Sequence, residues 1–234
     1  MNGFSELANF IWHVTDDILR GNIKQHEYGD VILPFVVLRR LDCVLQDSKE
    51  EVLKTYNKFK DKLPDTHQVL IEATKGLSFF DTSLYDIKWL SQDAKNLEIN
   101  FNNYINGFSL NIHNILENFQ IVKTIMKLAK NDLLFLLIKK FNNVDLHPDK
   151  VSNHDIGYIF EELLRKFSEL SNETVGEHYI PHEVIRLIVN ILFAEQKNDL
   201  KGKGIIRTVY DPAAGTGGML ITAKEHIQAN INLM

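Results

Sequence analysis

The chain has 234 residues, of which 44% are hydrophobic and 24% are charged, and its formal net charge is -5. This composition is typical of a globular protein with one sizeable core or two smaller ones. The acidic balance is spread along the chain, with about -2 over residues 1–150 and about -3 over residues 151–234. It excludes the basic tail or strongly basic composition of a protein that grips DNA by itself. The single cysteine, Cys43, excludes an intrachain disulfide and a cysteine-rich zinc site, and it fits a reducing compartment.

The N-terminus lacks the basic stretch and apolar core that mark a signal peptide. The longest apolar runs, Val31–Leu38 and Leu133–Ile138, are far shorter than the ~20 residues that a helix needs to cross a bilayer. We therefore expect a cytoplasmic protein that makes no membrane contact.

Apolar residues recur at helical spacing in the first part of the chain. They predict a first helix that ends at Arg20-Gly21 and a buried second helix from about Glu27 to Gln46, which Pro34 kinks or starts. The same periodicity predicts three further helices, over Lys49–Lys62, Ile115–Ile125 and Leu133–Phe141. We expect a loop at Phe79–Asp86, and the asparagine-rich stretch Asp93–Asn114 defines no clear helix boundaries.

The segment Asn142–Asn153 contains a proline and several turn-forming residues. It is predicted to separate an N-terminal helical domain, residues 1–150, from a second domain, residues 151–234. The second domain is expected to begin with an amphipathic helix, Ile156–Leu170, and to continue with a helix from Pro181 to Phe193.

A glycine-rich turn follows a predicted strand, Ile205–Tyr210, and precedes a helical pattern that opens at Met219. The turn reads Asp211-Pro212-Ala213-Ala214-Gly215-Thr216-Gly217-Gly218. Its glycines remove Cβ atoms where a ligand would pack on the backbone, and they tolerate positive φ. The following helix N-terminus favours a carboxylate or a phosphate. The order of strand, glycine turn and helix predicts a site for a charged, nucleotide-type cofactor, while a purely structural tight turn is the alternative.

Two common phosphate-binding motifs fit the turn less well. A dinucleotide fingerprint that starts at Gly215 needs glycine or alanine at position 220, which is Leu220. The Gly-Lys-Ser/Thr string of a P-loop does not occur in the sequence.

The eight-residue turn resembles the first conserved motif of S-adenosylmethionine-dependent DNA adenine methyltransferases. More narrowly, it is similar to that of the methyltransferase (modification) subunit of type I restriction–modification systems. Two further segments share the resemblance. The residues from Leu19 to Leu41 are similar to the N-terminal helical domain of those subunits. Gly176–Ile185 resembles the segment that precedes the glycine turn and helps to close the cofactor pocket. The similarity spans nearly the whole chain and is weakest between about Ser48 and Asn153.

The resemblance implies a mainly α-helical chain, in which a helical domain is followed by the truncated start of an α/β, Rossmann-like methyltransferase domain. It implies transfer of a methyl group from S-adenosyl-L-methionine to N6 of adenine in duplex DNA, after the adenine has left the base stack. The implied partners are duplex DNA, a specificity subunit, a second modification subunit and a restriction subunit. It implies no metal.

The resemblance also assigns cofactor-binding residues in the second and third similar segments. They are Glu177, His178, Tyr179, Ile180, Pro181, His182, Asp211, Ala214, Gly215, Thr216 and Gly217. The family usually has Thr-Pro where this sequence has Ile180-Pro181. An alkyl group therefore replaces a hydroxyl that would face the amino-acid end of the cofactor.

The catalytic loop of such enzymes carries an Asn/Asp-Pro-Pro-aromatic motif, and this sequence contains no Pro-Pro pair. It also lacks the ribose-binding carboxylate that the family places about 20 residues beyond the turn. We therefore expect an N-terminal fragment of the enzyme that is inactive alone and has no catalytic residue of its own. Two alternatives stay open: a non-catalytic interaction or assembly module, and a solitary adenine-specific methyltransferase or combined restriction–methylation polypeptide.

Overall fold

The computed structural model describes residues 3–170, 180, 182–194, 208–214 and 217–232. Within these ranges the chain is mainly helical, as the sequence predicts, and no strand longer than an isolated bridge occurs. The chain forms two compact units, Met1–Glu173 and Thr174–Met234. None of the helices in the described ranges combines the length and the apolar character that crossing a bilayer requires.

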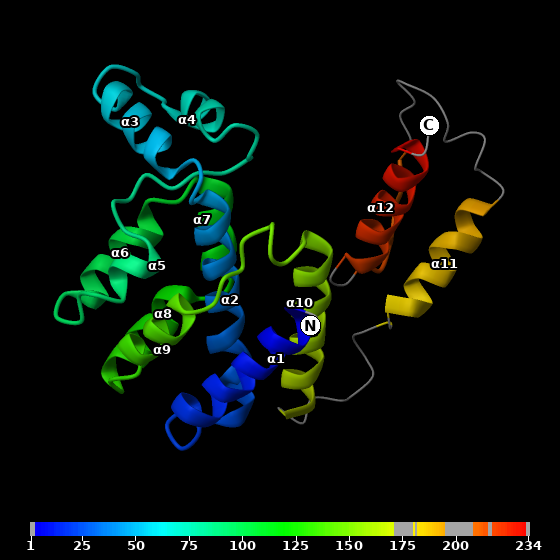
Figure 1. Ribbon diagram of the computed structural model, residues 1–234, viewed down its shortest axis with the longest axis horizontal. Coiled ribbons are helices and arrows are strands. Elements are labelled where there is room, and N and C mark those ends of the chain that lie inside the picture. Colours follow the sequence, from blue (N-terminus) through cyan, green and yellow to red (C-terminus); the bar gives the residue numbers. More distant parts are fainter. Residues whose placement is uncertain (1–2, 171–179, 181, 195–207, 215–216, 233–234) are drawn as a thin grey trace. The chain divides into compact units, whose positions relative to one another are not determined.

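Unit 1 contains the helices of the first part of the chain (Figure 1), most of which contribute side chains to the main hydrophobic core. They are α1 (Gly3–Val14), η1 (Thr15–Leu19), η2 (Gln25–Glu27), α2 (Tyr28–Leu45), α3 (Lys49–Phe59), α4 (His67–Ala73), α5 (Ile87–Leu90), α6 (Leu97–Asn106), α7 (Leu110–Asn118), α8 (Ile121–Lys130), α9 (Leu134–Asn142) and α10 (Asn153–Leu170).

Helix α2 is the centre of unit 1 and packs against α8, α9 and α10 (Figure 1). Its middle is apolar on nearly every side, and such a helix is stable only when it is covered all round. Phe35 is fully buried, and its ring lies 5.8 Å from that of Phe101 and 5.6 Å from that of Phe141. The predicted buried helix is confirmed.

Pro34 lies inside α2. A proline has no N–H, so the carbonyl four residues earlier, that of Asp30, loses its helical donor. The hydroxyl of Thr124 on α8 donates a long hydrogen bond of 3.5 Å to this carbonyl. A neighbouring helix thus supplies a polar partner for the carbonyl that loses its helical donor to the proline.

Helix α10 packs on α1 and α2. Its residues Ile159, Leu163 and Phe167, four apart, are buried in the main core. At Gly29 on α2 a Cβ atom would lie 3.3 Å from the Cβ of Phe167, so the glycine permits this close crossing. Contacts therefore group α10 with unit 1, whereas the sequence-based domain limit at residues 150 and 151 stays a prediction.

Two adjacent arginines of α2 hold the segment that leads into α10. Arg39 donates from Nε to the carbonyl of Val144 at 2.7 Å. The buried Arg40 donates from Nη1 to the carbonyls of Leu146 and Val151, the latter at 2.8 Å. Its Nη2 donates to Oδ1 of Asn153 at 2.6 Å, at the first residue of α10.

A small second core joins α3 to α4. Val52, Leu70 and Phe80 are buried together there, apart from the main core. The predicted loop at Phe79–Asp86 is confirmed, and an isolated bridge pairs Asp81 with Phe108.

Some helix limits differ from the prediction. A single helix over Ile115–Ile125 is wrong, because Gln120 takes a left-handed conformation with φ of 50° and separates α7 from α8. Helix α3 ends at Phe59 rather than at Lys62. The first helical segment ends at Leu19 and is followed by Gly21 with φ of 82°, as predicted. The predicted strand Ile205–Tyr210 lies largely outside the described residues, and its described part, 208–210, is irregular.

Candidate cofactor site

Two helices make up the described part of unit 2: α11 (His182–Ala194), which confirms the predicted helix, and α12 (Gly218–Asn232). They share a small core in which Ile185, Val189 and Phe193 of α11 are buried with Ala223 of α12. The four-residue spacing on α11 places its three core residues on one stripe that faces α12.

The two helices run parallel. The first turn of α12 contacts the first turn of α11, since a Cβ on Gly218 would lie 3.1 Å from Cδ1 of Ile185. Eight residues further along each helix, the rings of Phe193 and His226 stack with centroids 5.6 Å apart. Both helix N-termini therefore lie at the same end of the pair, and their positive dipole ends face the same region.

Hydrogen bonds within the glycine turn hold its described part in place. Oδ1 of Asp211 accepts a hydrogen bond from the N–H of Ala213 at 2.9 Å. The N–H of Gly217 donates to the carbonyl of Ala214 at 2.7 Å. The carbonyl of Gly217 then accepts from Ile221 at 3.0 Å, the first helical bond of α12. The carboxylate of Asp211 thus helps to shape the turn.

Gly217 has a φ of 80°, which L-residues with a Cβ adopt only with strain. A Cβ at this position would have no atom within 4 Å, so the backbone borders open space. Glycine is therefore required here by the backbone conformation and not by crowding. The expected positive φ is confirmed at Gly217, while Gly215 lies outside the described residues.

Polar groups surround the start of α12. The N–H groups of the first turn of a helix have no acceptor within the helix. One turn further on, Oγ1 of Thr222 is buried and has no hydrogen-bond partner among the described residues. Neither Thr222 nor the Phe193–His226 stack could be predicted from the sequence, because neither belongs to the turn motif and both depend on how α11 and α12 pack.

The other predicted site residues are only partly described. Ile180 is 50% exposed and lies two residues before His182, which begins α11. Residues outside the described ranges are Glu177, His178, Tyr179, Pro181, Gly215 and Thr216. His182 is the first residue of α11, and Gly217 directly precedes the first residue of α12. Because the first turns of the two helices are in contact through Ile185 and Gly218, His182 and Gly217 lie at the same end of the pair.

The chain matches known families in two adjacent parts. Residues 7–141 match the HsdM N-terminal domain, and residues 151–233 match N-6 DNA Methylase. The type I restriction enzyme MjaIX methylase subunit of Methanocaldococcus jannaschii is 26% identical over 95% of this chain and 40% of its own length. The EcoEI methylase subunit of Escherichia coli is 35% identical over 42% of this chain and 18% of its own length. The EcoKI methylase subunit of the same species is 30% identical over 35% of this chain and 14% of its own length.

The chain spans two fifths or less of the length of these relatives. The larger of the two matched parts covers more than half of the chain, and it coincides with most of the helical unit 1. The chain therefore belongs to the family of the HsdM N-terminal domain, here joined to a segment of the N-6 DNA Methylase family.

Proposed function

We propose that this chain acts as the helical domain and the first part of the methyltransferase domain of a type I restriction–modification DNA methyltransferase subunit in the cytoplasm. The complete subunit would transfer a methyl group from S-adenosyl-L-methionine to N6 of adenine in duplex DNA. The match of residues 151–233 to N-6 DNA Methylase and the names of the relatives support this proposal.

The observation that carries the proposal is the geometry of α11 and α12. The two segments to which the resemblance assigns cofactor binding lead into these helices, and the helices start at the same end of the pair. Parallel neighbours need a connection that returns the chain, and the predicted strand lies in that connection. This arrangement is typical of the start of an α/β nucleotide-binding domain.

The described residues fit the proposed cofactor. S-adenosyl-L-methionine carries a carboxylate and hydroxyl groups, and it supplies a methyl group on a positively charged sulfur. The first-turn N–H groups of α12 suit the carboxylate. The open space beside Gly217 lets a ligand approach the backbone. Asp211 shapes the turn through Ala213 and keeps a second carboxylate oxygen for a donor on the ligand.

Helix α11 gives independent support for a larger domain. Opposite its core stripe it carries the exposed apolar residues Val184, Leu187 and Ile191. A helix that is apolar on two sides is typically buried between layers. We propose that the remainder of the methyltransferase domain covers this side, since the relatives are more than twice as long as the chain.

The acidic net charge is consistent with shared DNA recognition. Contacts to duplex DNA would come from a local basic patch or from a partner subunit, because the net charge of this chain is -5. We propose the specificity subunit, a second modification subunit and the restriction subunit as its partners, in line with the type I restriction enzymes to which the relatives belong.

The test is binding of S-adenosyl-L-methionine by the full-length subunit, measured by equilibrium dialysis with the labelled cofactor. Gly217→Ala places a Cβ at φ of 80°, a strain of about 1–2 kcal/mol. An unoccupied turn can relieve this strain by leaving that conformation, whereas binding would restore it, so affinity should fall by up to about 5- to 30-fold. Gly157→Ala in α10 is the matched control, since its Cβ would meet nothing within 4 Å. Unchanged affinity in the first variant would refute the role of the turn. A subunit that binds no cofactor at all would favour a pure assembly module.

A further inference from the structure

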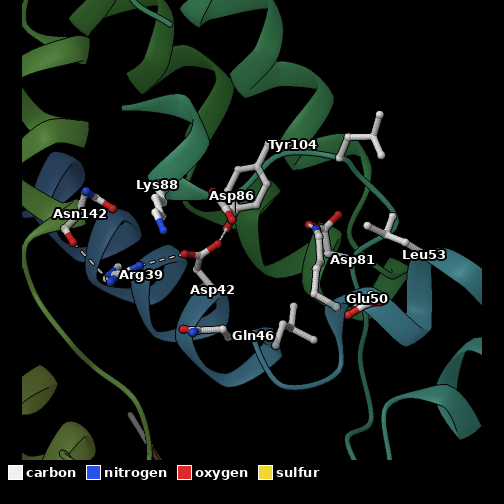
Figure 2. Close-up of a pocket in the computed structure, with 13 residues that line it drawn as sticks. Arg39, Asp42, Gln46, Glu50, Leu53, Asp81, Asp86, Lys88, Tyr104 and Asn142 are labelled. Atoms are coloured by element: carbon white, nitrogen blue, oxygen red, sulfur yellow. Dashed lines mark hydrogen bonds and ion pairs between the residues drawn. The ribbon is translucent and has the colours of Figure 1, made fainter. Parts of the chain in front are cut away.

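A charged pocket of about 670 Å³ lies in unit 1, away from the glycine turn in sequence and formed by helices of unit 1 alone (Figure 2). Parts of α2, α3, α5, α6 and α9 and the loop between residues 81 and 86 form its walls. The lining residues are Arg39, Asp42, Leu45, Gln46, Lys49, Glu50, Leu53, Asp81, Leu84, Asp86, Lys88, Tyr104 and Asn142.

Asp42 forms the floor of this pocket. Its Oδ2 accepts from Nη1 of Arg39 at 2.9 Å, and its Oδ1 accepts from the hydroxyl of Tyr104 at 3.3 Å (Figure 2). The side chain is only 11% exposed. Burial, and next the nearby carboxylate of Asp86, raise the pKa of Asp42 to about 6. The pocket therefore holds a buried carboxylate, that of Asp42, with the carboxylate of Asp86 close by.

The buried cations of the pocket are engaged by other acceptors. Arg39 donates to Asp42 but also to the carbonyls of Val144 and Asn142, at 2.7 and 3.4 Å. Nζ of Lys49 pairs with Asp81 and lies 3.2 Å from the carbonyl of Tyr85. Asp86 accepts from the backbone N–H of Trp89 at 2.5 Å. Lys88, a lining cation two residues further along the chain, is exposed to solvent. Asp42 has Arg39 as its cationic partner and also accepts from the N–H of Ile87 at 3.3 Å, whereas no ion pair of Asp86 occurs among the described residues. A further cation would therefore gain most from Asp86, with Asp42 beside it.

One exposed residue of the pocket lining, Leu84, is apolar and belongs to a loop that hydrogen bonds hold in place. Leu84 is 75% exposed although its loop is held at several points. The N–H of Thr82 donates to the carbonyl of Gly107 at 2.8 Å, and the carboxylate of Asp81 accepts from the N–H of Ser83 at 2.8 Å. An exposed leucine on a rigid loop at the edge of a charged pocket offers contact area to a ligand without an ordering cost.

We propose that this pocket receives an arginine side chain of a partner protein, with its guanidinium between Asp42 and Asp86 and its aliphatic stem against Leu84. Arginine suits the pocket better than lysine, because its planar fork can serve two carboxylates at once. Leu53 also lines the pocket and offers a second apolar side chain for the stem. The inference is independent of the proposed methyl transfer.

The probe is N-acetyl-L-arginine amide, titrated into the full chain by calorimetry and by fluorescence. Trp12→Phe leaves Trp89, which adjoins Lys88, as the reporter of the site, since the sequence has two tryptophans. We expect saturable binding with a change in Trp89 emission, and none with the neutral isostere N-acetyl-L-citrulline amide. Asp86→Asn should abolish most of the response while keeping a side chain that caps α5.

Two further comparisons separate the pocket from nonspecific attraction. Leu84→Ser should weaken binding, whereas Leu110→Ser, at a leucine that is 71% exposed at the start of α7, should not. Lys88→Met removes a competing cation and should tighten binding. Equal responses to the arginine and citrulline amides, no saturable response, or full binding by Asp86→Asn would each overturn the proposal.

The pH dependence gives an additional check. With a pKa of about 6 for Asp42, its ionised fraction falls roughly tenfold between pH 7.5 and pH 5.0, so affinity should fall by up to that factor. The other charged or titratable groups that face the pocket are Arg39, Lys49, Glu50, Asp81, Asp86, Lys88 and Tyr104. A constant affinity over this range would contradict a role for Asp42.

Discussion

Arg40→Met is expected to destabilise unit 1 strongly, because it removes the donor that ties α2 to the start of α10. Arg40 is buried and makes hydrogen bonds to two carbonyls, those of Leu146 and Val151, and to the side chain of Asn153. Methionine fills a similar volume, so the loss reports polar contacts rather than a cavity.

The size of the effect follows from those contacts. A buried carbonyl left without its donor costs about 1–3 kcal/mol, and two are left here. Part of this cost is offset in the variant, because burying the guanidinium is itself unfavourable, as the lowered pKa of Arg40 indicates. We expect a net loss of about 3 kcal/mol in the free energy of unfolding, or about 6–12 °C in Tm for a unit of this size.

The measurement is urea unfolding followed by tryptophan fluorescence. Both tryptophans, Trp12 and Trp89, belong to unit 1 and report its unfolding. Arg20→Met is the matched control, since Arg20 forms an ion pair with Asp16 that is exposed on both sides and contributes ~0–1 kcal/mol. If the two variants lowered the free energy of unfolding equally, Arg40 would not anchor the segment that leads into α10. Faster hydrogen exchange over residues 144–153 in Arg40→Met would locate the loss.

Three further predictions concern stability. Gly157→Ala, at an exposed helical position where a Cβ meets nothing, should raise the free energy of unfolding by up to ~1 kcal/mol in urea titration; a loss would contradict the open space beside it. Gly107→Ala should lower it by about 1–3 kcal/mol, because the Cβ would collide with Asp81 and lie 2.5 Å from the backbone nitrogen of Ser83. Since the pKa of Asp42 is about 6 in the folded chain and ~3.9 in an unfolded one, the native state holds an extra proton between these values. That contribution to stability is present below pH ~4 and is lost as the pH rises through 6, by up to ~3 kcal/mol. Denaturation from pH 4 to 7 should show this slope in the wild type and a flatter one in Asp42→Asn.

The longer helices could be predicted from the sequence because their apolar periodicity records which side is buried. The break between α7 and α8 could not, since Gln120 takes a positive φ without any glycine or proline to mark it. The short helices α4 and α5 could not be predicted from periodicity either. One or two turns provide too few residues to establish a period.

The cofactor site was predictable as a local motif but not as an arrangement. The glycine string indicates a turn with positive φ, and Gly217 has that conformation. The parallel pairing of α11 and α12 depends on the contact between Ile185 and Gly218, which are more than thirty residues apart. The charged pocket could not be predicted from any motif, because Asp42, Asp86 and Tyr104 come from three separate segments of the chain. No local pattern could have joined them.

Helix α10 connects the two matched families in a way that neither match indicates. Its sequence lies within the N-6 DNA Methylase match, residues 151–233, yet its buried residues Ile159, Leu163 and Phe167 belong to the core of unit 1. Arg40 reaches the first residue of α10, and Gly29 admits Phe167 to α2. The sequence that begins the methyltransferase match is therefore built into the helical unit as a structural element. If α2, or the segment before α10 that Arg40 holds, were displaced, α10 would have to move with it, because a close-packed core transmits strain.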